Sequence, residues 1–201
     1  ILDIDSGINC LNEFKEPTCV IIKHTNPCGV ASSNNILKSF KLALASDKKS
    51  AFGGIVFLNR KVSKATAEEI KKHFFEGIIA LDFDKGALKI LSNKKKMILI
   101  KNKNYKINRY DSRSTVFGTL NQSKDNKIIN QKMIKLVSRK KANAKQIDDL
   151  LFALKIVKHL KSNAIALVKN KQLVGVGCGQ TSRIDALKTS INKMKENFGN
   201  I

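Results

Sequence analysis

Short apolar segments alternate with amphipathic ones along the first hundred residues of the chain. Four apolar runs bounded by polar residues are typical of buried strands, at 19–22, 51–58, 77–81 and 97–100. Apolar residues at helical spacing predict three helices, at 34–46, 63–75 and 84–96. We expect Ser32 or Ser33 to cap the first helix and Ser63 to cap the second. This alternation predicts an α/β fold with a substantially parallel sheet that is covered on both faces.

The pattern changes over residues 101–131, which are polar and irregular. Within them, 113–122 is the one predicted strand, and we expect it near an edge of the sheet. Residues 144–163 then give the clearest helical pattern of the chain. Its broad apolar stripe consists of Ile147, Leu150, Leu151, Leu154, Val157 and Leu160. We therefore expect the polar stretch to separate two subdomains, 1–130 and 131–201.

Two strands and a helix are predicted to complete the chain. Residues 164–177 predict a hairpin whose strands are joined at Asn170 and Lys171. A final helix over 181–199 is expected to begin at Thr181 or Ser182, because either hydroxyl can accept hydrogen bonds from the first free amides.

With 201 residues, 42% of them hydrophobic, the chain can bury one sizeable core or two small ones. No apolar run approaches the roughly 18 residues that span a bilayer, and the first ten residues lack the basic and apolar regions of a signal peptide. We therefore expect a globular cytoplasmic protein with no membrane partner. Because the chain does not begin with Met and opens within ordinary globular sequence, we also expect it to be a fragment.

The formal net charge of +22 raises nucleic acid as a partner, since clustered basic side chains neutralise phosphates. The excess is nearly all lysine, which is scattered along the chain beside many Asn and Ile residues. Because these three residue types share A/T-rich codons, base bias in the genome explains the charge without any function. We expect no specific nucleic acid partner. A basic nucleic-acid-binding protein is the competing class, and lysines gathered on one face would favour it.

The cysteine pattern gives no sign of a structural metal site. Cys10, Cys19, Cys28 and Cys178 form no C-x-x-C pair, and we expect reduced thiols. The stretch HTNPC at 24–28 contains pieces of a zinc deaminase motif, which needs H-x-E and P-C-x-x-C. Asn26 stands where the glutamate is needed, and the third residue after the cysteine is an alanine. We therefore predict no zinc and no other metal ligands here.

The stretch VIIKHTNPCGVA, residues 20–31, places Lys23 and His24 directly after an apolar strand. Ligands of α/β sheets collect beyond the carboxyl ends of strands, and we expect Pro27 and Gly29 to turn the backbone and hold both side chains there. An imidazole can move a proton near neutral pH, and an adjacent ammonium stabilises developing negative charge. The alternative is a surface lysine beside a histidine that only fills a turn.

A second candidate lies in residues 162–186. Gly175, Gly177 and Gly179 alternate with larger residues and allow close approach of the backbone, and the predicted helix start that follows offers free amides and the guanidinium of Arg183. Such a site suits a phosphate or a carboxylate. The alternative is that these glycines mark only bulges or tight packing.

Four blocks of the sequence occur in the order and spacing of one enzyme family. They are KHTNPCG at 23–29, SAFGGIVFLNR at 50–60, EGIIA at 76–80 and KSNAIALVKNKQLVGVGCGQTSRIDA at 161–186. Over nearly its whole length the chain resembles the AICAR transformylase domain of the bifunctional purine biosynthesis enzymes, AICAR formyltransferase/IMP cyclohydrolase.

The resemblance implies transfer of a formyl group from 10-formyltetrahydrofolate to the amine of AICAR, giving formyl-AICAR, which the family's separate cyclohydrolase domain closes to IMP. It also implies a cytidine deaminase-like, three-layer α/β/α fold in two related subdomains, and a homodimer with sites at the subunit interface. AICAR and folate are then the expected ligands, without zinc and with a monovalent cation as a further expectation. Descent from such a fold would explain the deaminase-like pieces in HTNPC.

By motif match to the family, His24 is the proton-transfer histidine, Lys23 is its partner, and Asn163 contacts the reacting groups. The chemistry agrees, because a weakly nucleophilic aromatic amine must lose a proton and the tetrahedral oxyanion needs nearby donors. The asparagine amide can both donate to and accept from the reacting groups. The resemblance further implies substrate-binding roles for Ser50, Phe52, Gly53, Glu76, Gly179, Gln180 and Arg183.

Parts of the family pattern fall outside these 201 residues. The cyclohydrolase domain and an upstream substrate arginine would precede Ile1, and the rest of the second subdomain would follow Ile201. We therefore expect the second subdomain to be truncated and this piece alone to be inactive. A decayed remnant kept as an interaction module is a third possibility, against which the intact Lys23, His24 and Asn163 argue.

Overall fold

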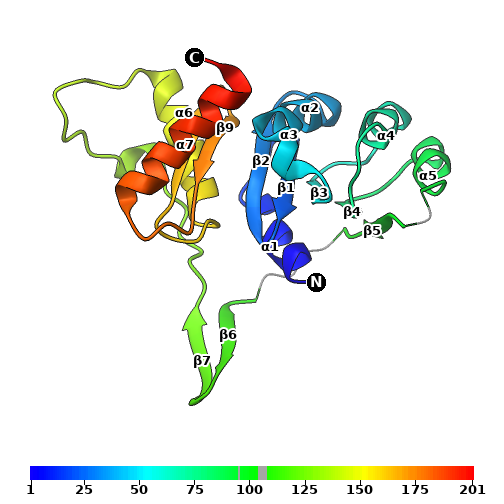
Figure 1. The fold of residues 1–201 in the computed structure, drawn as a ribbon, viewed down its shortest axis with the longest axis horizontal. Helices are drawn as coiled ribbons and strands as arrows, with labels where there is room; N and C mark the ends of the chain where they lie inside the picture. The colour runs from blue at the N-terminus through cyan, green and yellow to red at the C-terminus, as the bar shows by residue number, and fades with distance from the viewer. Residues whose placement is uncertain (95, 104–107) are drawn as a thin grey trace.

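A mixed seven-stranded sheet forms the centre of the fold (Figure 1). The structure is a computed structural model that describes residues 1–94, 96–103 and 108–201. In spatial order the strands are β5 (Ile98–Lys101), β4 (Gly77–Ala80), β3 (Ile55–Leu58), β1 (Thr18–Lys23), β2 (Asn26–Ser32), β9 (Gln172–Gly177) and β8 (Ile165–Lys169). The β3–β4 and β4–β5 ladders are parallel, whereas the other four ladders of this sheet are antiparallel. The prediction of a substantially parallel sheet is therefore wrong, because two-residue turns join β1 to β2 and β8 to β9.

Helices cover both faces of the sheet and make three layers, α/β/α, as expected. They are α1 (Leu2–Leu11), α2 (Ile36–Ser46), α3 (Lys48–Ala51), α4 (Lys64–Lys71), α5 (Lys85–Leu91), the 3₁₀ helix η1 (Gln131–Met133), α6 (Ala144–Val157) and α7 (Arg183–Phe198). Packing on one face involves α2, α4 and α5, and packing on the other involves α1 and α6. None of the helices in the described residues is long and apolar enough to cross a membrane.

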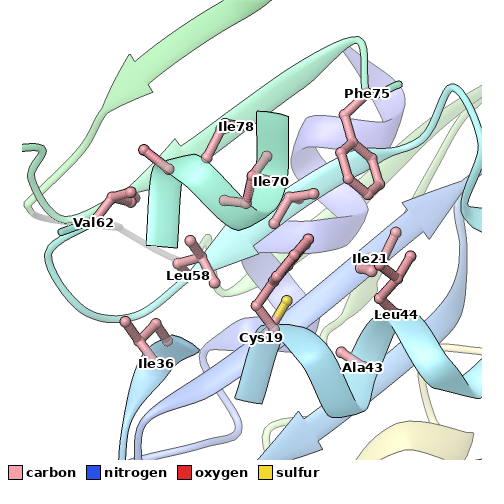
Figure 2. Close-up of a cluster of buried hydrophobic side chains, with 14 of the residues drawn as sticks. Cys19, Ile21, Ile36, Ala43, Leu44, Leu58, Val62, Ile70, Phe75 and Ile78 are labelled. Atoms are coloured by element: carbon pink, nitrogen blue, oxygen red, sulfur yellow. The ribbon is translucent and has the colours of Figure 1, made fainter. Parts of the chain in front are cut away.

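The apolar run at 19–22 forms a strand buried on both faces, which explains why it is continuous rather than alternating. Cys19 and Ile21 join the cluster beneath α2 and α4, shown in Figure 2. Val20 and Ile22 point the other way, into the cluster formed with α1 and α6. The core is thus divided by the sheet into two apolar layers.

The NPCG segment is a strand that sequence reasoning took for a turn. Asn26–Ser32 is strand β2, so the expected turn at Pro27 and Gly29 is wrong. The chain turns just before this segment, at His24 and Thr25, whose φ values are 52° and 64°. Gly29 serves packing instead, since a Cβ there would lie 2.1 Å from the carbonyl oxygen of Ala43 in α2.

The polar stretch contains a hairpin rather than the single edge strand that we predicted. β6 (Tyr110–Thr115) and β7 (Gly118–Ser123) pair with each other in a separate two-stranded sheet that projects from the main body (Figure 1). Gly118 has φ 122° at the start of β7, a conformation that L side chains rarely adopt. Lys95 and residues 104–107, which belong to the predicted 84–96 helix and to the polar stretch, lie outside the described residues.

The predicted stripe is buried only in part: Leu160 is buried, but the side of α6 that packs on the core includes residues outside the stripe. Phe152 and Ile156 are buried, whereas Leu150 and Leu154 are 50% and 41% exposed. The helix also ends at Val157, before the predicted end. Apolar residues cover much of the surface of this helix, so periodicity alone could not show which side of it faces the core.

Helix starts and strand limits were predicted in part. Ser63 caps α4 and Ser182 caps α7, as expected, but α2 is capped by Asn35 rather than by Ser32 or Ser33. Helices α1 and α3 were not predicted. Because α3 occupies 48–51, strand β3 begins at Ile55 and not at Ala51.

Candidate functional site

Strand register gathers the predicted site residues at one edge of the sheet. Lys23 pairs with Asn26 at the end of the β1–β2 hairpin, and Ile22 pairs with Ile55 of β3. Ile55 in turn pairs with Gly77, the residue after Glu76. In the other part of the sheet, Ile165 at the start of β8 pairs with Gly177 at the end of β9. Asn163, which precedes β8, and Gly179, which follows β9, therefore lie just beyond these two strand ends.

The Lys23–His24 pair lies in a tight two-residue turn. Both His24 and Thr25 have positive φ, as a type I′ hairpin turn requires. The amide of Thr25 donates to Asp3 Oδ1 at 2.7 Å, and Asn26 Nδ2 donates to the carbonyl of His24 at 2.9 Å. The turn is therefore fixed by α1, while His24 itself is exposed to solvent.

Lys23 is bonded to the next predicted block, SAFGG. Its Nζ donates to the carbonyl oxygen of Gly53 at 2.9 Å. Gly53 has φ 67°, and its own amide donates to the carbonyl of Phe74 at 2.9 Å. The amide of Glu76 donates to the carbonyl of Gly54 at 3.0 Å. The structure thus brings Lys23, the 50–54 loop and the backbone of Glu76 together.

A buried carboxylate organises the start of that loop. Asp47 caps α3 by accepting from the amide of Ser50 at 2.9 Å and from its hydroxyl at 2.7 Å. Lys193 of α7 places its Nζ 2.5 Å from Asp47 Oδ2. Burial raises the pKa of Asp47, but the hydrogen bonds from Lys193 and Ser50 outweigh it and hold the pKa below the ordinary 3.8.

Sequence reasoning missed both Asp47 and Lys193. The D-x-x-S spacing before SAFGG is typical of a helix cap and could have indicated Asp47. No local pattern could have indicated Lys193, which is 146 positions away from its partner.

Two exposed aromatic rings stand beside the loop. Phe52 is 66% exposed and Phe74 is 47% exposed, with ring centroids 5.1 Å apart. Both border a pocket of 420 Å³ that Lys48, Lys72 and Lys94 also line. Pairs of apolar rings with cations nearby suit a flat aromatic ligand that carries negative charge.

Asn163 is held by the segment that follows β9. Its Nδ2 donates to the carbonyl of Gln180 at 3.0 Å and to that of Thr181 at 3.1 Å. The reverse assignment would set the amide oxygen against two carbonyl oxygens, so the hydrogen bonds fix the orientation. Both amide hydrogens are therefore committed, and Oδ1 is left as the acceptor for a ligand.

The remaining predicted residues surround the start of α7. The amide of Gly179 donates to the carbonyl of Lys161 at 2.7 Å, and Gly179 has φ 67°. Arg183 is the first residue of α7 and is exposed, with Ser182 as the cap. Ser182 Oγ accepts from the amides of Ile184 and Asp185, so the helix offers its dipole more than free amides. A guanidinium at the positive end of this 16-residue helix favours a phosphate or a carboxylate.

The predicted residues therefore form two groups. One contains Lys23, His24, Ser50, Phe52, Gly53 and Glu76, and the other contains Asn163, Gly179, Gln180 and Arg183. Hydrogen bonds given above join Lys23 to Gly53 in the first group and Asn163 to Gln180 in the second. Lys193 of α7 contacts the first group directly, with Nζ 3.3 Å from Ser50 Oγ.

Cys28, the cysteine of the NPCG segment, is buried. Burial raises the pKa of the Cys28 thiol to about 12, so it is a packed apolar group and not a nucleophile. In the part of the chain that the structure describes, no three His, Cys, Asp or Glu side chains are grouped as metal ligands. What the edge offers is an imidazole, an ammonium, a guanidinium and a fixed amide oxygen, which suits proton transfer on an anionic substrate.

Comparison with known proteins gives a clear family match. The family model described as AICARFT/IMPCHase bienzyme matches residues 1–193. The bifunctional purine biosynthesis protein PurH of Caldicellulosiruptor saccharolyticus is 49% identical over 197 residues, which cover 97% of this chain and 38% of that protein. The PurH proteins of Persephonella marina and Bacteroides thetaiotaomicron are each 46% identical, over 97% and 99% of this chain and 38% and 39% of theirs.

The likeness to solved structures is slight. Acinetobacter baumannii RibD, form 2, aligns with 49% of this chain and 32% of that chain, with a TM-score of 0.32 and 14% sequence identity. A likeness of this size supports no statement about the fold or the function of this chain.

Proposed function

The chain belongs to the AICARFT/IMPCHase bienzyme family, and from this premise we propose that it is part of an enzyme that transfers a formyl group to AICAR. The donor is 10-formyltetrahydrofolate and the product is formyl-AICAR. The chain spans 38% of the length of the relative from Caldicellulosiruptor saccharolyticus. The activity therefore belongs to the whole protein, with IMP cyclohydrolase activity proposed for the part of it outside these residues.

The observation that carries the proposal is the Lys23–His24 turn bonded to the SAFGG loop. His24 is exposed at the end of two buried strands, and Lys23 is anchored to the Gly53 carbonyl by one of its three donors. An anchored ammonium on the residue before an accessible imidazole supplies the two groups that proton transfer to and from an amide can use.

The reaction divides naturally among these groups. As the amine nitrogen of AICAR attacks the formyl carbon, His24 accepts a proton from that nitrogen, and the free donors of Lys23 stabilise the oxyanion of the tetrahedral intermediate. Collapse of the intermediate breaks the bond from the formyl carbon to N10 of the folate. His24 then returns the proton to N10, so that tetrahydrofolate leaves and the histidine is neutral again.

The second group orients the substrates. The free Oδ1 of Asn163 accepts a hydrogen bond from the reacting amine, because both hydrogens of its own amide are occupied. Arg183, at the positive end of the α7 dipole, receives a phosphate or a carboxylate. Phe52 packs on a flat ring, and Ser50, Gly53, Glu76, Gly179 and Gln180 complete the contacts.

Finer features of the proposal follow the family. We assign the chain to a cytidine deaminase-like fold with subdomains at 1–130 and 131–201, the second of them incomplete. The full protein is proposed to be a cytoplasmic homodimer that binds AICAR and folate, without zinc and without specific nucleic acid. The single residue pair between β2 and β9, Ala31 with Gln172, supports a division of the sheet into two units.

Formyl transfer itself tests the proposal. The chain and the product of the longest open reading frame that contains it are each supplied with AICAR and 10-formyltetrahydrofolate, and release of tetrahydrofolate is followed. We expect the longer product to catalyse the transfer and the 201-residue chain to be inactive alone. A longer product that folds, binds AICAR and yet transfers no formyl group would contradict the proposal.

A further inference from the structure

A sheltered ion pair joins the last helix to the loop that carries half of the candidate site. Asp47 lies between α2 and α3 with its side chain 6% exposed, and Lys193 lies ten residues into α7 with its side chain 33% exposed. Their charged atoms are 2.5 Å apart. Because the Asp47 carboxylate is nearly covered, salt screens this pair less than a pair on the open surface. The pair therefore ties α7 to the segment between α2 and α3.

The pair begins a path of hydrogen bonds and loop backbone that ends at the candidate catalytic turn. Lys193 Nζ contacts both Asp47 and the hydroxyl of Ser50, and Asp47 accepts from the amide and the hydroxyl of Ser50. Three residues later the carbonyl of Gly53 accepts from Lys23 Nζ. Displacement of Asp47 would therefore shift the acceptor that holds Lys23 beside His24.

The connection matters because few backbone bonds join the two parts of the sheet. Ala31 and Gln172 are the one residue pair in the β2–β9 ladder. The place of α7 is set by β9, since a Cβ on Gly175 would lie 2.2 Å from the carbonyl oxygen of Ser190. Lys193 thus transmits the position of α7 across the junction to the 50–53 loop.

We infer that Lys193 is a positioning residue that, through Asp47, holds the 50–53 loop in place against Lys23. The inference rests on the proposed formyl transfer, to which it adds a residue remote from the reacting atoms. It predicts that loss of the Lys193 ammonium loosens the loop and slows the reaction while the rest of the fold stays intact.

Amide hydrogen exchange and kinetics on the full-length protein test the inference together. In Lys193→Met, we expect amides 48–54 to exchange about tenfold faster, while amides of α4 keep their wild-type rates. We expect kcat/KM for formyl transfer to fall by 10- to 100-fold. Lys193→Arg, which keeps a cation at the same place, should restore most of both losses.

Lys195→Met is the matched control, since Lys195 is an exposed lysine on the same helix. It should change neither loop exchange nor kcat/KM. Where Lys193→Met does not fold, Asp47→Asn replaces it, because it removes the charge and keeps an oxygen that can cap α3. The inference would be overturned if Lys193→Met, or Asp47→Asn in its place, showed the same loop exchange and the same kcat/KM as the Lys195 control. Absence of formyl transfer in the wild type would instead overturn the proposed function.

Discussion

At the residue scale, the conformation and hydrogen bonding of the backbone determine which atoms of the candidate site side chains can reach a ligand. His24 sits in the left-handed region with φ 52°, which points the chain around a two-residue turn and leaves the imidazole exposed. Asn163 has both amide hydrogens bound to carbonyls, which leaves its oxygen to face a ligand. The motif match supplied the residue types, whereas the division of labour within the Asn163 amide needed the structure.

The Asn163 amide gives a prediction that separates its donor and acceptor roles. Asn163→Asp would set a carboxylate oxygen against the carbonyls of Gln180 and Thr181, so two hydrogen bonds are replaced by repulsion. We expect about 1–3 kcal/mol of destabilisation in urea unfolding and a loss of formyl transfer. Asn163→Ala, which lets water reach the two carbonyls, should be the milder change in stability. An aspartate variant as stable as the alanine variant would refute the orientation of this amide.

Single residues were predictable where the signal is local. Lys23 was located correctly at the end of a strand because the apolar run before it is unambiguous. The Asp47–Lys193 pair was not predictable, since it depends on how α7 packs against the far part of the chain. Long-range charge pairs leave no trace in local composition.

At the element scale, glycine and proline were the source of the main error. The NPCG segment looked like a turn, yet it forms β2, with a register irregularity between Ile21 and Ile22 opposite Pro27. A strand can hold a proline beside an irregularity in its register, and a glycine where a helix packs closely on it. Such a strand has the same sequence signal as a turn. The actual turn residues, His24 and Thr25, are not among the residue types that usually indicate one.

The contact of α2 with β2 is tested by Gly29→Ala. The new Cβ would lie 2.1 Å from the Ala43 carbonyl oxygen, so helix and strand must separate. We expect about 1–3 kcal/mol of destabilisation in chemical unfolding, together with reduced formyl transfer, because α2 leads into Asp47.

Gly118→Ala is the control for that substitution. It strains the projecting hairpin, where a Cβ meets nothing within 4 Å, so unfolding of the main sheet should not change. A Gly29→Ala variant with the same free energy of unfolding as this control would contradict the close contact between Gly29 and the Ala43 carbonyl.

At the scale of the whole molecule, the sequence supported the layers but not the direction of the strands. Apolar runs identified β1, β3 and β4 as buried, and the alternation with helices indicated a covered sheet. The run at 97–100 was also expected to be buried, which is wrong, because β5 is an edge strand with Ile98 59% exposed. Strand direction depends on the length of each connection, and the turn between β1 and β2 was placed wrongly. The projecting β6–β7 hairpin has few apolar residues, so periodicity could not distinguish it from an irregular edge strand.

The two parts of the chain are also joined by a carboxylate that should make stability depend on pH. Glu13 Oε1 accepts from Lys158 Nζ at 2.7 Å and is 3.2 Å from His159 Nε2. Burial raises the pKa of Glu13, but the hydrogen bonds from His159 and Lys158 outweigh it and keep the pKa below the ordinary 4.5. Its contribution is therefore complete above pH 4.5 and is lost as the pH falls through the lowered value.

Glu13→Gln tests this dependence. We expect about 1.5–3 kcal/mol less stability than wild type at neutral pH in urea unfolding, with the difference shrinking as the pH is lowered below 4.5. A difference that stays constant over the acid range would show that the Glu13 charge does not hold α6 in place.

The most direct test of the proposed function is formyl transfer by His24→Asn in the longest open reading frame that contains this chain. Asparagine accepts positive φ, so the turn, the melting temperature and AICAR binding should be retained. We expect the rate to fall by about 10²- to 10⁴-fold, because the group that moves the proton is gone. A folded His24→Asn variant that binds AICAR and transfers formyl groups at the wild-type rate would contradict the assignment of this turn as the catalytic centre.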